Sequence, residues 1–290
     1  DGSTSTSDNQ TASENWDALK SFFTAYPQYA NNDFYVTGES YGFAIGNGCV
    51  DGDEGLSGVI QYQFHHGFSD TASWFQASTQ CCAGKIDGCD WGQAQNVNSF
   101  CSGYVSQEAN AAWYSGMNPY NYLNDCYPSA SMPRKDSRRF MKDLARRTKG
   151  KAAPPPLVLD SPICLNENPV INYLNQPAVR QALGVPSSVQ PWDICAEIPY
   201  QETTDTTRDY FLQAQAAGLR ALLYYGDVDM ACMPGFSFHL HETAIHLGNF
   251  LGGQRFSRKL GFKLNTAAKS YKVDGQVGGF YTQYQGLGFA

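Results

Sequence analysis

The chain has little charge for its length. Only 16% of its 290 residues are charged, 14% are aromatic, and the formal net charge is −7. This composition excludes a disordered protein, because apolar and aromatic residues in these proportions can build a core. The acidic balance excludes a general attraction to nucleic acid or to anionic membranes. We therefore expect a globular protein with one substantial core, or with one core and a smaller insertion.

Long apolar runs and targeting signals are also missing. No run of about 18 apolar residues could span a bilayer, so no membrane partner is expected. Residues 1–13 are polar and lack the basic and apolar regions of a signal peptide, so any targeting signal would lie upstream. Asn9 begins the one glycosylation sequon and is the candidate glycosylation site.

Regular Cys-x-x-Cys pairs, which are typical of zinc sites, are absent. Nine cysteines are nevertheless present, more than a reducing compartment usually favours. Four of them fall within 21 residues of a glycine-rich, loop-like stretch: Cys81, Cys82, Cys89 and Cys101. The sequence thus predicts an oxidised protein without a metal or another cofactor.

The first 42 residues predict a helix, a strand and a sharp turn. Apolar residues recur every three or four positions over residues 13–26, with Ser13 placed to cap the helix and Pro27 to end it. The aromatic and β-branched residues 34–37 favour a strand. The sequence Gly38-Glu39-Ser40-Tyr41-Gly42 follows this strand directly.

The middle of the chain has the pattern of an insertion. Residues 81–150 are rich in Gly, Asn, Ser and Tyr and show weak periodicity, which favours an inserted cap. Residues 134–151 hold nine of the twenty basic residues and predict an exposed, protease-sensitive loop. A binding site for polyanions is the alternative for this basic loop.

Regular patterns return in the second half of the chain. Short helices are expected at residues 170–174, 179–183 and 208–217. The nearly continuous apolar run 219–225 is typical of a buried parallel strand. An acidic loop with Asp227 and Asp229 comes directly after this strand.

The pattern Gly38-x-Ser40-x-Gly42 has the form of a nucleophile elbow. Glycines on both sides allow the sharp turn that lifts a serine hydroxyl above the sheet. The serine needs a base, and the base needs a carboxylate to orient it, in the chain order Ser, acid, His. Asp229 is the preferred acid and Asp227 its competitor. Three acidic residues shortly after the elbow are expected in a solvated turn: Asp51, Asp53 and Glu54.

Several blocks in this order resemble the serine carboxypeptidase family, in particular its lysosomal members and their invertebrate relatives. The blocks are GESYG at 38–42, FAIGNG at 43–48, the Cys81-Cys82 cluster, NYLNQPAVRQALGVP at 172–186 and GDVDMAC at 226–232. The resemblance implies the α/β-hydrolase fold: a mostly parallel sheet with helices on both faces and an inserted disulfide-rich cap, incomplete at both ends. It divides the chain into partial core (1–80), cap (81–165) and remaining core (166–290).

The same resemblance implies the residues of an active site. Ser40 is the expected nucleophile, Asp229 the triad acid, and the backbone N–H of Tyr41 one oxyanion donor. Glu39 matches a glutamate that holds the terminal carboxylate of the substrate. Because two carboxylates repel, Glu39 must be partly protonated, which implies an acidic working pH. Cys232 matches a thiol near the substrate pocket.

The disulfides also follow from the resemblance. It pairs Cys81 with Cys101, Cys82 with Cys89, and Cys126 with Cys164. The last pair would span the basic loop, which then becomes a candidate processing site. The states of Cys49 and Cys195 stay open.

The chain departs from the family pattern in three places. The family carries its catalytic histidine a few residues beyond the position of Ala290, so that residue is not expected in this chain. The elbow is followed at once by the strand-like FAIG segment, where the family has a helix. The family's other oxyanion donor belongs to a segment upstream of residue 1.

None of the five histidines is expected to serve as the base. His65 and His66 lie in a segment that resembles a structural block of the family. The other three lie in residues 233–248, which interrupt the family pattern, and their His-x-His spacing is not expected to bind metal: His239, His241 and His246.

The sequence therefore predicts a serine carboxypeptidase that removes carboxyl-terminal residues from peptides through an acyl-enzyme. Little activity is expected from this exact chain, because the histidine is missing. An acyltransferase or esterase, and a non-catalytic binding or protective protein, are the alternatives. The expected partners are peptides with a free carboxyl terminus, the expected location is lysosomal or extracellular, and a homodimer stays open.

Overall fold

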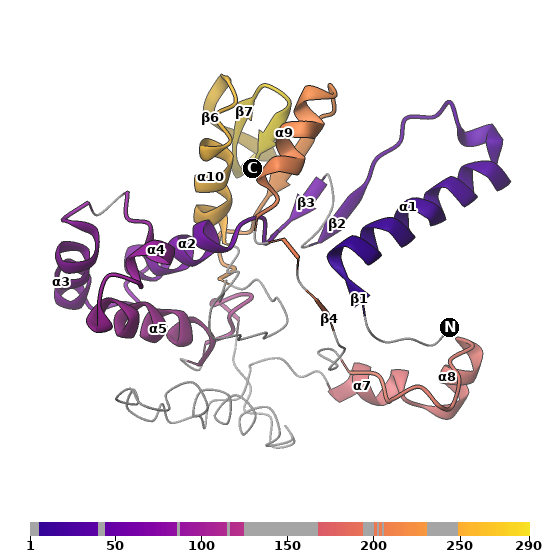
Figure 1. Cartoon of the computed structure of the whole chain (residues 1–290), viewed down its shortest axis with the longest axis horizontal. Coiled ribbons are helices and arrows are strands. Elements are labelled where there is room, and N and C mark those ends of the chain that lie inside the picture. The colour runs from indigo at the N-terminus through magenta and orange to yellow at the C-terminus, as the bar shows by residue number, and fades with distance from the viewer. Residues whose placement is uncertain are drawn as a thin grey trace. The chain divides into compact units, whose positions relative to one another are not determined.

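The computed structural model describes most of the chain. The described residues are 6–39, 44–85, 88–114, 117–124, 168–193, 200–201, 203–204, 206–230 and 249–290. They fall into two compact units, each assembled from segments that are distant in the sequence (Figure 1). The first unit comprises residues 1–34 and 165–205, and the second comprises residues 35–164 and 206–290.

The first unit is mostly helical. Its elements are β1 (Thr6–Ser7), α1 (Asp8–Ala25), the 3₁₀ turn η1 (Pro27–Tyr29), α7 (Asn168–Leu174), α8 (Pro177–Ala182) and β4 (Tyr200–Gln201). β1 and β4 pair in parallel, and the carboxylate of Asp8 accepts a hydrogen bond of 2.6 Å from the backbone N–H of Thr203. α7 and α8 lie where the sequence predicted short helices, so this prediction is confirmed.

Helix α1 is longer than its sequence predicts. The side chain of Ser7, not Ser13, caps the helix by accepting a hydrogen bond from the backbone N–H of Gln10 at 3.3 Å. The helix ends at Ala25, before Pro27 as expected. The candidate glycosylation residue Asn9 consequently lies exposed in the first helical turn.

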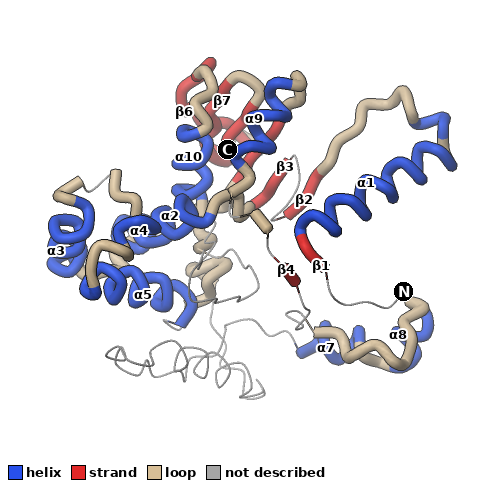
Figure 2. The backbone as a smooth tube through the Cα atoms, viewed as in Figure 1, coloured by secondary structure: helices blue, strands red, loops and turns tan. Residues whose placement is uncertain are grey.

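The second unit contains a six-stranded sheet (Figure 2). Its strands, in spatial order, are β2 (Thr37–Glu39), β3 (Ala44–Gly46), β5 (Ala221–Tyr224), β8 (Leu287–Phe289), β7 (Gln276–Tyr284) and β6 (Leu264–Val273). The first four strands are parallel, and β7 and β6 are antiparallel to their neighbours. The expected mostly parallel α/β sheet is thereby confirmed.

Two strands differ in detail from the prediction. β5 lies within the predicted apolar run but is not the buried strand that was expected, because Leu223 is buried whereas Leu222 and Tyr224 are exposed. β2 begins only at Thr37, because Phe34, Tyr35 and Val36 precede it as an irregular, exposed segment. Strand propensity thus located the strand to within a few residues but placed it too early in the chain.

Two helices cover part of this sheet with apolar side chains. α9 (Arg208–Ala216) and α10 (Phe250–Lys259) contribute Phe211 and Phe256, whose rings meet edge to face at 5.3 Å. They share a core with residues of β3, β5 and β8. Gly218 follows α9 at φ 75°, as expected for a glycine beyond a helix end.

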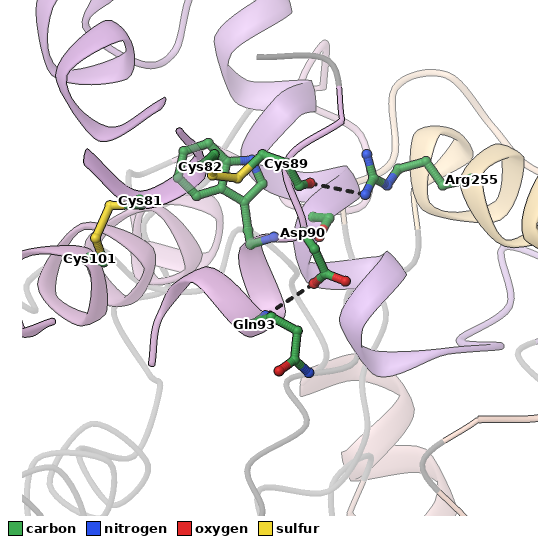
Figure 3. Close-up of a disulfide and its surroundings, with 9 residues drawn as sticks. Cys81, Cys82, Cys89, Asp90, Gln93, Cys101 and Arg255 are labelled. Atoms are coloured by element: carbon green, nitrogen blue, oxygen red, sulfur yellow. Dashed lines mark hydrogen bonds between the residues drawn. A yellow bond between two sulfur atoms is a disulfide. The ribbon is translucent and has the colours of Figure 1, made fainter. Parts of the chain in front are cut away.

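The other described helices of the second unit pack around a separate core that carries two disulfides, and this group is called the insert. They are α2 (Gly52–His65), α3 (Thr71–Cys82), α4 (Trp91–Ala94) and α5 (Ser99–Tyr114). Trp74 and Trp91 lie fully buried at its centre. Cys81 bonds to Cys101 and Cys82 to Cys89, the pairings implied by the sequence (Figure 3).

The cysteine-rich stretch is therefore not the loop that its composition suggested. Cys81 and Cys82 are the last residues of α3, and Cys101 lies in the first turn of α5. A further cysteine, Cys49, is also disulfide-bonded. The pair proposed for Cys126 and Cys164 lies outside the described residues, as does the basic loop 134–151.

A buried ion pair joins α2 to α10, at residues expected in a solvated turn. Asp51 caps α2 instead, accepting a hydrogen bond of 2.9 Å from the backbone N–H of Glu54. Glu54 is only 3% exposed and accepts a hydrogen bond of 2.8 Å from Arg255. Arg255 also donates to the carbonyl of Cys89 at 3.0 Å (Figure 3), and Lys259 binds the second oxygen of Glu54.

The two helices can come this close because glycines face one another. A methyl group added at Gly58 of α2 would lie 2.4 Å from the backbone nitrogen of Gly252 of α10. Backbone cannot yield at that distance without separating the helices. The crossing of α2 and α10 therefore requires glycine at position 58.

The same substitution at two helical glycines should have opposite effects. We expect Gly58→Ala to lower the free energy of unfolding by about 1–3 kcal/mol through overpacking. Gly103→Ala in α5 meets open space and should raise it by about 0.5–1 kcal/mol, because alanine favours the helix. Urea denaturation of both variants measures the difference, and equal midpoints would contradict the close crossing.

Stability should also depend on a buried acid of the insert, Glu108. Its carboxylate accepts a hydrogen bond from the hydroxyl of Ser69. Burial raises the pKa of Glu108 above its usual value, although the hydrogen bond from Ser69 partly opposes this. The folded state then holds the proton more tightly than the unfolded state, so this group lowers stability as the pH rises above about 4.

Removing the charge of Glu108 should remove this dependence. We expect Glu108→Gln to be more stable than the unchanged chain at pH 7 and to lose that advantage below about pH 4. Glu14→Gln makes the same change on the exposed surface of α1 and serves as the control. Urea midpoints at both pH values test this, and a constant difference between Glu108→Gln and the unchanged chain would refute it.

Candidate active site

The carboxyl ends of four parallel strands meet at one edge of the sheet. The register places Glu39 of β2 beside Gly46 of β3, and Gly46 beside Tyr224 of β5. Leu223 of β5 pairs with Phe289 of β8. Loops that leave parallel strands at this edge are the usual place for a site in α/β proteins.

The described residues lead up to the predicted nucleophile but do not include it. Glu39 is the last residue of β2, so the chain leaves the sheet at this edge immediately before Ser40. Ser40 and Tyr41 lie outside the described residues, and so does Cys232. Their predicted roles stay predictions.

The acidic loop after β5 begins beside Asn47, the first residue after β3. The backbone N–H of Gly226 donates to Oδ1 of Asn47 at 3.0 Å, and Nδ2 of Asn47 donates to Oδ2 of Asp229. Asp229 is 6% exposed, whereas its competitor Asp227 lies at the surface. Of the two carboxylates, that of Asp229 is the one buried against other segments of the unit.

Two further segments hold the same loop. The hydroxyl of Tyr62, in α2, donates to the carbonyl of Asp227 at 2.5 Å. The backbone N–H of Tyr122 donates to the carbonyl of Val228 at 3.3 Å, and that of Met230 donates to the carbonyl of Pro119 at 2.8 Å. Hydrogen bonds thus hold residues 226–230 from three directions, which restricts the carboxylate of Asp229 to a narrow range of positions.

Tyr62 can act only as a neutral donor in this position. Burial raises the pKa of Tyr62 far above its usual value, and neighbouring Tyr122 and the carboxylates of Asp227 and Asp229 raise it further. Its phenol therefore stays protonated at acidic and neutral pH. The hydroxyl can donate to the acidic loop throughout that range.

His66 has a structural place beside Tyr62. The two rings stack with centroids 3.8 Å apart, and Nδ1 of His66 lies 2.8 Å from the backbone carbonyl of Tyr62. His65 is the last residue of α2. The predicted structural segment fits these contacts, while the three histidines of residues 233–248 lie outside the described residues.

Sequence reasoning missed Asn47 and Tyr62. Asn47 follows the strand-like FAIG segment and so reaches the sheet edge at which Asp229 was expected, which is a signal that could have found it. Tyr62 lies in a helix among apolar residues, and nothing in its local sequence indicates a hydroxyl aimed at the acidic loop.

The residues that the structure describes contain neither a metal-ligand cluster nor a membrane-spanning helix. Over these residues, no three His, Cys, Asp or Glu side chains gather as a metal ion would require. No helix among them has the length and apolar character to cross a bilayer.

Comparison with known proteins points to one family. The family model described as serine carboxypeptidase matches residues 1–42 and 41–290. The lysosomal protective protein of Mus musculus is 27% identical, over 98% of this chain and 64% of its own length. Serine carboxypeptidase ctsa-4.1 of Caenorhabditis elegans is 27% identical, over 78% of this chain and 53% of its own length.

The chain is also similar to a solved structure. Kex1(delta)p, a prohormone-processing carboxypeptidase from Saccharomyces cerevisiae, has a TM-score of 0.46 at 16% identity, covering 85% of this chain and 48% of its own. The chain thus spans between about half and two thirds of the length of the curated relatives named above.

The hydrogen bond from Tyr62 to the acidic loop can be tested with two buried tyrosines. We expect Tyr62→Phe to lower the free energy of unfolding by about 1–2 kcal/mol, because the carbonyl of Asp227 loses its donor. Tyr104→Phe is the matched control, since the buried Tyr104 hydroxyl has no hydrogen-bond partner within the described ranges. Its loss should be neutral or slightly stabilising, and equal urea midpoints for both variants would contradict the assignment.

Proposed function

Because this chain belongs to the serine carboxypeptidase family, we propose that the protein carrying it releases carboxyl-terminal residues from peptides. Ser40 attacks the last peptide bond, a histidine takes its proton, and Asp229 orients that histidine. The reaction passes through an acyl-enzyme, which water then hydrolyses. One observation carries the proposal: Asp229 is buried at the sheet edge at which β2 ends, immediately before Ser40.

The same edge offers a place for the base. Ala290 follows β8, where its backbone N–H donates to Leu223 and its carbonyl accepts from Tyr225, both at 2.9 Å. Residues that follow Ala290 would emerge next to the strand that carries the acidic loop. We propose that the catalytic histidine lies there, in agreement with the chain order Ser, acid, His of this fold.

The remaining site residues receive the roles that the family pattern gives them. The Tyr41 N–H serves as an oxyanion donor and Glu39 holds the terminal carboxylate of the substrate. Because that contact needs a protonated Glu39, the reaction should proceed best at acidic pH. An acidic working pH and the disulfides fit a lysosomal or secreted protein.

The connection between β2 and β3 departs from the family. These parallel neighbours are joined by only four residues, 40–43, although a parallel pair normally needs a crossover of a dozen or more. The family model matches the chain in two parts, which meet at residues 41 and 42, within this same connection. We propose that the family's helix after the nucleophile elbow is missing from this sequence.

This short connection favours a second function for a protein that keeps it. Without the helix, the amides that stabilise the oxyanion lack their support, and removing one such donor costs about 10²–10³ in rate. A non-catalytic, peptide-binding protein is then the better description. Calorimetry with a peptide that has a free carboxyl terminus separates the two, because binding should survive Ser40→Ala and hydrolysis should not.

Catalysis by the full-length protein can be tested at the two aspartates of the acidic loop. We expect Asp229→Asn to lower kcat by about 10⁴-fold, because the histidine loses its orienting partner. Asp227→Asn, at the surface of the same loop, should change kcat little. The assay is release of the last residue from a blocked dipeptide at pH 5, with the carboxyl-terminal amide of that dipeptide as the negative control.

The assay distinguishes a wrong assignment of the triad acid from a wrong assignment of the activity. If Asp227→Asn abolishes release while Asp229→Asn does not, the acid has been misassigned. If the unchanged full-length protein releases nothing, the proposed activity is wrong.

A further inference from the structure

Asn47 makes three hydrogen bonds that together connect β3 to the acidic loop. Its backbone N–H donates to the carbonyl of Tyr224 at 2.8 Å, which fixes it at the end of β5. Its side-chain oxygen accepts from the N–H of Gly226 at 3.0 Å, and its side-chain nitrogen donates to Oδ2 of Asp229. The side-chain amide of Asn47 thus connects Gly226, the first residue of the acidic loop, to the carboxylate of Asp229.

The conformation of Asn47 suits this task. Its φ is 46°, in the left-handed region that asparagine tolerates better than most residues. The turn directs the side chain across the end of β5 instead of along β3. Aspartate would fit the same backbone and keep the acceptor for Gly226, but it has no N–H to donate to Asp229.

We propose that Asn47 is the positioning residue of the triad acid: it fixes the carboxylate of Asp229 and favours its charged form. This inference rests on the proposed function, because it assumes that Asp229 orients the catalytic histidine. Asn47 needs no contact with substrate or with the reacting atoms for this role. It acts through Asp229, as outer-shell hydrogen bonds orient the groups of other catalytic sites.

Titratable groups beside Asp229 also bear on its charge. Tyr62 from α2 lies close enough to Asp229, to Asp227 on the same loop and to Tyr122 of the segment 117–124 for each of them to affect its pKa. Burial raises the pKa of Tyr62, which therefore carries no charge at acidic pH, and Asp227 is exposed to solvent. A change in the donor at position 47 should therefore be visible in the titration of Asp229.

The test compares the same substitution at two asparagines of the full-length protein. Asn47→Asp replaces the donor by a second carboxylate. The expected result is a fall in kcat of about 10²-fold with little change in KM, because the acid loses its fixed position. The acid limb of the kcat profile should also move up by about one pH unit, since a neighbouring carboxylate disfavours the charged form of Asp229.

Asn98→Asp is the matched control. Asn98 lies exposed before α5 and accepts a hydrogen bond of 2.9 Å from the backbone N–H of Cys101, which an aspartate can also accept. Its kcat and acid limb should match those of the unchanged protein. If Asn47→Asp does not fold, Asn47→Gly keeps the backbone conformation, adds no charge and should still lower kcat and move the acid limb upward.

The outcomes separate this inference from the proposed function. An active unchanged protein, with Asn47→Asp or Asn47→Gly retaining its kcat and acid limb, overturns the role of Asn47 alone. A loss of stability without movement of the acid limb also overturns it, because a merely structural residue would behave in that way. An inactive unchanged protein overturns the proposed function, and the role of Asn47 with it.

Discussion

The second unit depends on the buried carboxylate of Glu54. Its charge would be costly in the interior without Arg255, which also donates to the carbonyl of Cys89 in the disulfide-rich insert (Figure 3). Arg255 therefore ties α10 to the insert at two places, at Glu54 of α2 and at the carbonyl of Cys89. Since α10 shares a core with the sheet, the insert is attached to the sheet through this contact and the glycine crossing beside it.

Helix α2 also holds the candidate site in place. α2 carries Glu54 in its first turn and Tyr62 near its end, so the contact that anchors the helix also fixes the hydroxyl that holds the acidic loop. Asn47 reaches that loop from the neighbouring strand. The acid is thus positioned jointly by the sheet and by the helix packed against α10.

Local sequence patterns predicted most of the helices and strands. The contacts that were not predicted join residues that are distant in the sequence. The apolar run before Gly226 was sufficient to locate β5 and the acidic loop, although Leu223 alone of the β5 residues is buried. Glu54 was expected in solvent because its partner Arg255 lies 201 residues away. Asn47 was overlooked for the same reason, since Asp229 is 182 residues distant. Ser7 and Ser13 are equivalent helix caps by composition, so only the folded chain distinguishes them.

Asn47 is followed by Gly48, and this neighbour has a chemical consequence. Glycine offers the least steric hindrance to attack of its backbone nitrogen on the preceding side-chain amide, the reaction that deamidates asparagine. The hydrogen bonds to Gly226 and Asp229 restrain the amide from the rotation that this cyclisation needs. Loosening of the acidic loop would therefore allow Asn47 to lose ammonia and form a cyclic imide, which water opens to aspartate or isoaspartate, so slow and irreversible damage to the site should begin at this residue.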